Sequence, residues 1–165
     1  ILGMNPLTYL FAPAIAGIPA GIVMMLLLSK AAKTGTFFLA SAVIAVFFLI
    51  MGRLPLDVVT MLVCGVIGEV LYGALGRKRF RGMAAAHAVY TCGLTLVAFI
   101  SVVLLKDAWA KAFAGYGRSY IAKVIEWVTP MSLVGLCLLS ALCGLIGAWL
   151  GKCLLKKHFE KAGVL

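Results

Sequence analysis

The sequence predicts an all-α integral membrane bundle, and three observations lead to that fold class. Of the 165 residues, 64% are hydrophobic and only 12% are charged, whereas soluble domains average about 45–50% apolar and about 25% charged residues. A chain with so few polar side chains cannot form a water-facing surface around its core. The apolar residues also fall in five long runs, and their continuous rather than alternating pattern favours helices over barrel strands.

Five spans are predicted to follow one another in a single transmembrane domain, 1–165. A helix needs about 20 residues to cross a bilayer, with about 17–25 tolerated. The predicted spans are 7–28, 36–51, 56–75, 82–105 and 130–150, with an outer loop at 106–129 and a tail at 151–165. Pro13, Pro19 and Pro55 lie in or at the start of spans, where neighbouring helices satisfy the freed backbone groups.

Basic residues alternate between the two sides of the predicted membrane. One side holds ten: Lys30, Lys33, Arg77, Lys78, Arg79, Arg81, Lys152, Lys156, Lys157 and Lys161. The other side holds five basic residues (Arg53, Lys106, Lys111, Arg118 and Lys123) and three acids (Asp57, Asp107 and Glu126), a net charge of +2. Because cytoplasmic loops carry the excess of Lys and Arg, the turn "RKRFR" and the C-terminus are predicted to be cytoplasmic.

This basic turn has two other interpretations. A net charge of +10 can indicate nucleic-acid binding, but the topology of a membrane protein explains the charge, so no nucleic-acid partner is expected. Contact with anionic lipid headgroups stays a second interpretation, with membrane lipid as the partner.

The start of the chain is unusual for this topology. Five spans with a cytoplasmic C-terminus place Ile1 outside. The segment "ILGMNPLTYL" reads like the end of a hydrophobic element followed by a turn at Asn5-Pro6. We therefore expect a sixth span before Ile1, which would place both ends inside. A cleaved signal peptide is the rival explanation.

The loop at 106–129 is the longest polar segment. It carries five aromatic side chains: Trp109, Phe113, Tyr116, Tyr120 and Trp127. In one interpretation it is an interfacial amphipathic element, since Trp and Tyr favour the headgroup level. In the other it is a lid over an outward-facing site, with aromatic surfaces for a flat ligand. Gly115 and Gly117 are predicted to break it between two short helices.

Small residues recur at helix-packing spacing in the first and last spans. The two stripes are Ala12, Ala16 and Ala20 in the first span, and Gly144, Gly147 and Gly151 in the last. In lipid, small residues let helix backbones approach closely. These stripes are predicted to pack the bundle or to meet a partner subunit, and the sequence leaves open which stripe does which.

Side chains that carry chemistry are scarce. Glu69 is the one acid well inside an apolar run, which makes it either a functional residue or a hydrogen-bonding residue between helices. Arg53 and Asp57 are four residues apart and either pair with each other or meet a charged substrate. His87 is predicted to pack rather than to bind metal, and the five cysteines are predicted to be reduced packing residues. No enzymatic activity, metal or cofactor is expected.

A family resemblance adds to these inferences. The ending "GLIGAWLGKCLLKKHFEKAGVL" resembles the C-terminus of the Trep_Strep (MptD-type) integral membrane family, in which a Gly-rich last span runs into a basic tail. The segment "FAPAIAGIPAGIVMMLLLSKAAKTGTFFLASAVI" resembles that family's second span, cytoplasmic turn and third span, and so does the position of Glu69 shortly before a basic turn. The family is assigned as substrate-binding (S) components of energy-coupling-factor (ECF) transporters, which have six helices.

The resemblance implies a mechanism in the bacterial cell membrane. An S component captures a small micronutrient outside, associates with a transmembrane coupling subunit and two ATPases, and tips in the membrane to release the substrate inside. The outer loop and residues 1–9 would form its lid. Candidate pocket residues, chosen by outer location and side-chain chemistry, are Asn5, Tyr9, Arg53, Asp57, Trp109, Tyr116, Tyr120 and Trp127.

Two other function classes stay open. A self-contained secondary transporter would rely on Glu69 for proton coupling and would not need ATP. A non-catalytic membrane subunit would use the outer aromatics only as headgroup anchors. For an importer, the aromatic segment suits a flat, vitamin-like substrate, and the mildly cationic mouth would tolerate an anion.

Overall fold

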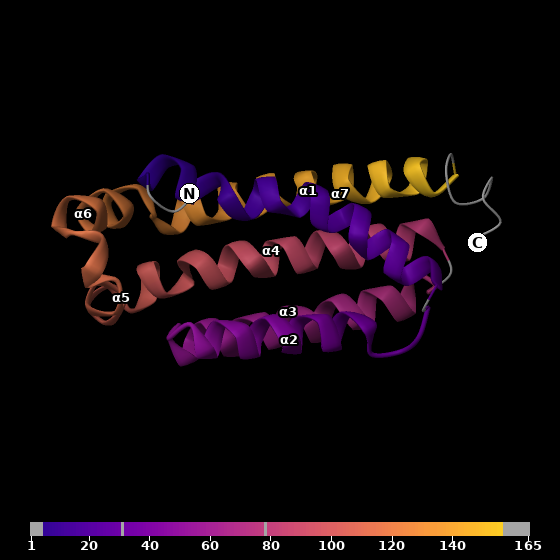
Figure 1. The fold of residues 1–165 in the computed structure, drawn as a ribbon, viewed down its shortest axis with the longest axis horizontal. Coiled ribbons are helices and arrows are strands. Elements are labelled where there is room, and N and C mark those ends of the chain that lie inside the picture. Colours follow the sequence, from indigo (N-terminus) through magenta and orange to yellow (C-terminus); the bar gives the residue numbers. More distant parts are fainter. Residues whose placement is uncertain (1–4, 31, 78, 157–165) are drawn as a thin grey trace.

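The computed structural model describes residues 5–30, 32–77 and 79–156, and every regular element within them is helical (Figure 1). The elements are α1 (Pro6–Lys30), α2 (Thr36–Ile50), α3 (Pro55–Ala74), α4 (Phe80–Leu104), α5 (Lys106–Ala112), the short 3-10 helix η1 (Ala114–Tyr116), α6 (Arg118–Trp127) and α7 (Pro130–Leu154). The predicted all-α membrane bundle is confirmed.

Helices lie in all five predicted span regions. Four of them, α1, α3, α4 and α7, have 20–25 residues and are long and apolar enough to cross a membrane. The helix α2 has 15 residues, a length of about 22 Å that is shorter than the roughly 30 Å hydrocarbon core. The helix α7 continues to Leu154, so the first residues of the predicted tail are helical. Residues 1–4, Lys78, Lys157 and Lys161 lie outside the described residues, as does the expected sixth span.

Local sequence explains where the helices begin. The side chain of Asn5 accepts a hydrogen bond from the backbone N–H of Leu7 at 2.9 Å, and Pro6 follows at the first helical position. Both are favoured at helix N-termini, so Asn5-Pro6 starts α1, while the predicted turn from residues 1–4 lies outside the described residues. At the start of α7, Thr129 and Ser132 form a capping box around Pro130.

The helix α4 is the centre of the bundle. It packs against α3 on one side and against α1 and α7 on the other, while α2 packs on α3. The helices α1 and α7 lie side by side and run in the same direction (Figure 1). More than half of the most apolar window of α4 is buried (56%), compared with 28% for α7, because α4 packs against α1, α3 and α7, whereas α7 packs mainly against α1 and α4.

A seam of glycines joins α1 and α7. A Cβ atom on Gly21 would lie 2.5 Å from the carbonyl carbon of Gly147, and one on Gly147 would lie 2.5 Å from the carbonyl oxygen of Ile18. Gly144 and Gly151 are also buried, against Thr91 and Met25 respectively. The glycine stripe of the last span therefore packs the bundle internally.

The alanine stripe of the first span behaves differently. Ala16 is exposed, and Ala12 and Ala20 are only half-buried. The small residues that α1 buries are instead Ala14, Gly17 and Gly21. The structure thus assigns internal packing to the glycines and leaves the alanine stripe on an outer face of the bundle.

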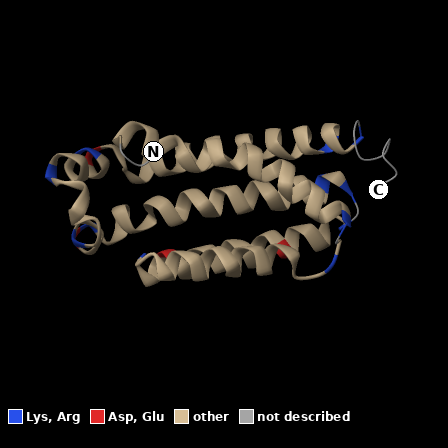
Figure 2. Cartoon of the chain, in the orientation of Figure 1, with Lys and Arg blue, Asp and Glu red and all other residues tan. Residues whose placement is uncertain are grey.

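The two ends of the bundle differ in their charges (Figure 2). We call one the basic end. Its described basic residues are Lys30, Lys33, Arg77, Arg79, Arg81, Lys152 and Lys156. We call the other the loop end; it consists of the turn 51–54, α5, η1 and α6, and carries both signs of charge.

Candidate functional site

The candidate site lies at the loop end, where the α2–α3 turn places two opposite charges. Gly52 has a φ of 75°, a left-handed conformation that glycine adopts without strain, and it turns the chain after α2. Leu54 is extended before Pro55, as expected for a residue that precedes proline. Asp57 then falls in the first turn of α3, where the helix dipole favours an acid. The turn directs Arg53 and Asp57 to the same place.

Asp57 is fully buried (0% exposed). The Ser101 hydroxyl of α4 donates a hydrogen bond to its Oδ1. Its Oδ2 lies 4.0 Å from Nη1 of Arg53, which is within ion-pair range but too long for a hydrogen bond. Both of these atoms are buried and have no hydrogen-bond partner among the described residues. The pair predicted from the sequence therefore exists, and each partner keeps one unused polar atom.

The Arg53 side chain, 15% exposed, is held by aromatic rings. Its Nη2 donates to the Tyr9 hydroxyl at 3.3 Å, and that hydroxyl donates to the carbonyl oxygen of Ala98 at 3.3 Å. The guanidinium carbon lies 5.0 Å from the centre of the Phe113 ring and 5.6 Å from that of Phe48. Cation–π contacts of this kind stabilise a cation that is partly removed from water.

Phe113 belongs to a row of five neighbouring rings that we call the aromatic layer: Trp109, Phe113, Tyr116, Tyr120 and Tyr9. Trp109 stacks on Phe113 with ring centres 4.8 Å apart and planes at 20°. The next centre-to-centre distances along the layer are 5.8, 5.2 and 6.2 Å. Trp109 is completely buried, and its indole Nε1 has no hydrogen-bond partner among the described residues. Two members of the layer, Phe113 and Tyr9, contact the Arg53 guanidinium directly.

Tyr120 contributes a neutral phenol to this layer. The pKa of Tyr120 is raised to about 12, mainly by burial and to a smaller extent by the neighbouring Tyr9 and Tyr116, while Arg53 opposes the shift. At neutral pH the hydroxyl therefore stays protonated and is able to donate a hydrogen bond.

The structure brings together six of the eight candidate pocket residues: Tyr9, Arg53, Asp57, Trp109, Tyr116 and Tyr120. It separates the other two. Asn5 is exposed and caps α1 with its side chain. Trp127 is 37% exposed at the end of α6 and makes no ring contact with the aromatic layer. Both residues were chosen because of their outer location, but that location does not bring them to the Arg53–Asp57 pair or to the aromatic layer.

Sequence reasoning missed two residues of the site. Phe113 is the C-cap residue of α5 and lies four residues after Trp109. This spacing, which places side chains on the same side of a helix, was the signal available in the sequence. Ser101 lies within a long apolar run, and its contact with Asp57 depends on how α3 and α4 align. No signal in the sequence gives that alignment.

Glu69 lies at the opposite end of the bundle. Its Oε2 accepts a hydrogen bond from the backbone N–H of Phe37 at 3.0 Å, in the first turn of α2. The N-cap residue of that helix, Gly35, has no side chain to supply this bond. A carboxylate at a helix N-terminus is stabilised by the free N–H groups and the helix dipole. Glu69 thus makes a hydrogen bond between helices; its Oε1 is buried and unpaired in the described part of the chain.

His87 and Cys64 are buried, Cys92, Cys137 and Cys143 are half-buried, and Cys153 is exposed, so the predicted packing role does not extend to Cys153. His87 is buried in α4 and its Nε2 donates to the carbonyl oxygen of Gly17 at 3.1 Å. The five cysteines are free thiols. Across residues 5–30, 32–77 and 79–156, no group of three His, Cys, Asp or Glu side chains gathers that could hold a metal ion.

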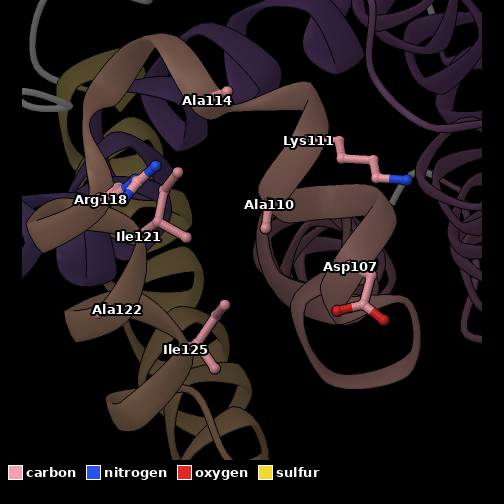
Figure 3. A pocket seen from close by; sticks show the side chains of 8 residues that line it. All are labelled: Asp107, Ala110, Lys111, Ala114, Arg118, Ile121, Ala122 and Ile125. Atoms are coloured by element: carbon pink, nitrogen blue, oxygen red, sulfur yellow. The ribbon is translucent and has the colours of Figure 1, made fainter.

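An open groove of about 730 Å³ lies between α5 and α6 (Figure 3). Its lining residues are Asp107, Ala110, Lys111, Ala114, Arg118, Ile121, Ala122 and Ile125. Ile121 and Ile125 point from α6 toward α5, whereas Lys111 points away (Figure 3). None of the lining residues belongs to the aromatic layer, so α5 and α6 present one face to the groove and another to the buried charge pair.

Comparison with known proteins gives one family. A family model described as "Hypothetical bacterial integral membrane protein (Trep_Strep)" matches residues 1–161. The match includes every helix that the structure describes, α1 to α7. No curated protein and no solved structure matches the chain.

Proposed function

The chain belongs to the Trep_Strep family of bacterial integral membrane proteins, and on that premise we propose that it is the substrate-binding component of an ECF-type importer. It captures a small micronutrient at the loop end. It then delivers the substrate through a transmembrane coupling subunit that is driven by two ATPases. The protein itself performs no chemical step on the substrate.

The observation that carries this proposal is a set of unpaired polar atoms at the loop end, two in the Arg53–Asp57 pair and one in the aromatic layer. Asp57 Oδ2, Arg53 Nη1 and Trp109 Nε1 are all buried without hydrogen-bond partners among the described residues. Each such atom costs about 1–3 kcal/mol, and ionisable residues within membrane helices generally mark functional sites. A ligand that pairs these atoms would recover part of that cost.

The distribution of charge supports capture from outside. Lys and Arg accumulate at the basic end, and the cytoplasmic side of a membrane protein carries such an excess. In the proposed orientation the basic end and the C-terminus therefore face the cytoplasm. The loop end, with its buried charge pair, then faces the outer solution from which a nutrient arrives.

The segment from α5 to α6 has the construction of a lid. It begins where Leu105 interrupts the helical path from α4, with φ −131° and ψ 49°. It contains Gly117 with φ 91° and ψ 151°, a conformation that is essentially restricted to glycine. Trp109 and Val124 are its fully buried side chains. A segment with only two fully buried side chains, and with its helical path interrupted at Leu105 and Gly117, is suited to open and close over a site.

Extraction of the full-length protein from its native membranes tests the proposal. We expect a coupling subunit and two ATPases to co-purify in mild detergent, identified by mass spectrometry. We also expect uptake by intact cells to stop when ATP is depleted while the proton gradient is held. Purification without an ATPase, together with uptake that survives ATP depletion, would contradict the importer.

The same experiment distinguishes the importer from the alternative function, a secondary transporter. For that class, Glu69 is the proton-coupling residue predicted from the sequence, and Glu69→Gln would abolish uptake. The bond from Phe37 N–H to Glu69 supports a structural role instead. We therefore expect Glu69→Gln to retain uptake and to lose about 0.3–1 kcal/mol of stability, the usual size of a charge–dipole interaction.

A further inference from the structure

We propose that the site selects a neutral, planar heteroaromatic compound whose edge carries an N–H donor beside a C=O acceptor, as in an amide or a lactam. This inference rests on the proposed function, since it assigns a substrate class to the same site. It concerns what the site accepts, and it is tested separately from how the substrate crosses the membrane.

The charges of the site favour a neutral ligand. Arg53 and Asp57 carry opposite charges and approach within 4.0 Å, so the pair is neutral overall. An anionic ligand beside them would add an uncompensated negative charge to a buried region, which is strongly unfavourable. Sequence reasoning expected the cationic mouth to tolerate an anion. The complete burial of Asp57 beside Arg53 changes that expectation.

The unpaired atoms define the edge of the ligand. Asp57 Oδ2 needs a donor, whereas Arg53 Nη1 needs an acceptor, and these two atoms face each other. An amide or lactam presents N–H and C=O side by side and pairs with both. A carboxylate offers acceptors only and would repel Asp57. The indole N–H of Trp109 is a further donor, available to a second acceptor on the ring.

The aromatic layer defines the body of the ligand. Trp109 and Phe113 stack nearly parallel, with planes at 20°, and the Phe113 ring lies against the Arg53 guanidinium. A planar ring that stacks on these groups once the lid has opened gains stacking and cation–π contacts. Asp57 and Trp109 have no exposed surface. The ligand therefore reaches them only when α5 and α6 move away from the bundle.

Calorimetric titration of the full-length protein in lipid nanodiscs tests the selectivity with two matched pairs of probes. Nicotinamide and nicotinate share a ring and differ at the edge, because the second has a carboxylate in place of the amide. Pterin and pterin-6-carboxylate share the lactam edge and differ in net charge. We expect at least one neutral compound to bind, tenfold or more tightly than its carboxylate partner. Equal or tighter binding of the carboxylates, or no binding of any probe, would overturn the substrate class.

Three variants locate the selectivity in named side chains. Asp57→Asn leaves the Arg53 charge uncompensated, and we expect the preference to shift by tenfold or more toward nicotinate. Trp109→Phe keeps a ring but removes the N–H donor, and we expect about tenfold weaker binding of the neutral probe without a change of fold. Trp127→Phe, outside the aromatic layer, serves as the control and should bind like the wild type. If the Asp57→Asn variant folds normally and still prefers the neutral probe to its carboxylate partner as strongly as the wild type does, the inference would also be overturned.

The two proposals fail separately. Co-purified ATPases together with a preference for carboxylates would leave the importer standing and overturn the substrate class. The expected preference in a protein that co-purifies with no ATPase would leave the substrate class standing and overturn the importer.

Discussion

The seam between α1 and α7 and the lid formed by α5, η1 and α6 are built in opposite ways. At the seam, glycines bring two backbones into direct contact, with no room for a Cβ atom on Gly21 or Gly147. At the lid, two short helices are held to the bundle mainly by buried side chains such as Trp109 and Val124. A seam closed by backbone atoms cannot adjust, whereas a lid held by side chains is able to detach. The difference indicates a rigid bundle that carries a movable cover.

The largest effect on the global stability of the bundle is expected at the seam. In Gly147→Ala the new methyl group would lie 2.5 Å from the carbonyl oxygen of Ile18 and 2.8 Å from that of Gly17. Because backbone atoms cannot give way cheaply, we expect a loss of about 2–3 kcal/mol, measured by thermal unfolding in detergent. Gly135→Ala, also in α7 but with nothing within 4 Å of its Cβ position, is the matched control. Equal stability of the two variants would contradict the tight seam.

Removal of the main lid anchor is expected to act locally. Trp109→Ala deletes a completely buried side chain, which ordinarily costs about 3–5 kcal/mol. Here we expect that cost to appear as opening of the lid, because the bundle below folds through other contacts. Hydrogen exchange of residues 106–127 should rise at least tenfold while the exchange of α4 changes little. Trp149→Ala, on an exposed face of α7 (57% exposed), should leave both unchanged.

A smaller effect is expected at the turn within the lid. Gly117 has φ 91° and ψ 151°, where a side chain costs about 1–3 kcal/mol. We therefore expect Gly117→Ala to increase proteolysis of the lid several-fold, with little change in the unfolding temperature of the bundle. Gly115→Ala is the matched control, since Gly115 has no positive φ and no atom within 4 Å of its Cβ position. Similar proteolysis of both variants would contradict a backbone requirement at Gly117.

The smallest effect is expected from the ionisation of Tyr120. Its pKa is raised to about 12, whereas an unfolded tyrosine ionises near pH 10. The neutral form is thus favoured in the folded state, and its contribution to stability is present below pH 10 and is lost as the pH rises to about 12. Ultraviolet titration should show one phenolate transition near pH 12 that disappears in Tyr120→Phe. A transition near pH 10 at this residue would indicate that the lid does not cover it.

Much of the fold could be predicted from the sequence because hydrophobic runs locate helices directly. The seam could not, since the stripes Ala12–Ala16–Ala20 and Gly17–Gly21 have the same spacing on neighbouring faces of α1. Only the packing of α7 shows that the glycines face inward. The start of α1 at Pro6 agrees with the predicted start of the first span at residue 7, although Asn and Pro favour turns and helix N-termini alike.

The candidate site could likewise be predicted only in part from the sequence. The position of Arg53 and Asp57 around Pro55 indicated their meeting, because residues four apart at a helix start share a face. The aromatic composition of 106–129 indicated a cover but not which rings turn inward, so Trp127 was included and Phe113 left out. The Ser101–Asp57 contact joins two helices whose alignment depends on packing across the whole bundle.

The most direct test of a binding site beneath the lid is native mass spectrometry of the full-length protein purified from its own membranes. We expect the wild type to carry a bound small molecule and the folded Asp57→Asn variant to lose it, because Asp57 supplies the buried acceptor. Trp127→Phe should retain it. If the wild type carries no small molecule, or if Asp57→Asn retains the same one, the ligand site does not lie at the Arg53–Asp57 pair.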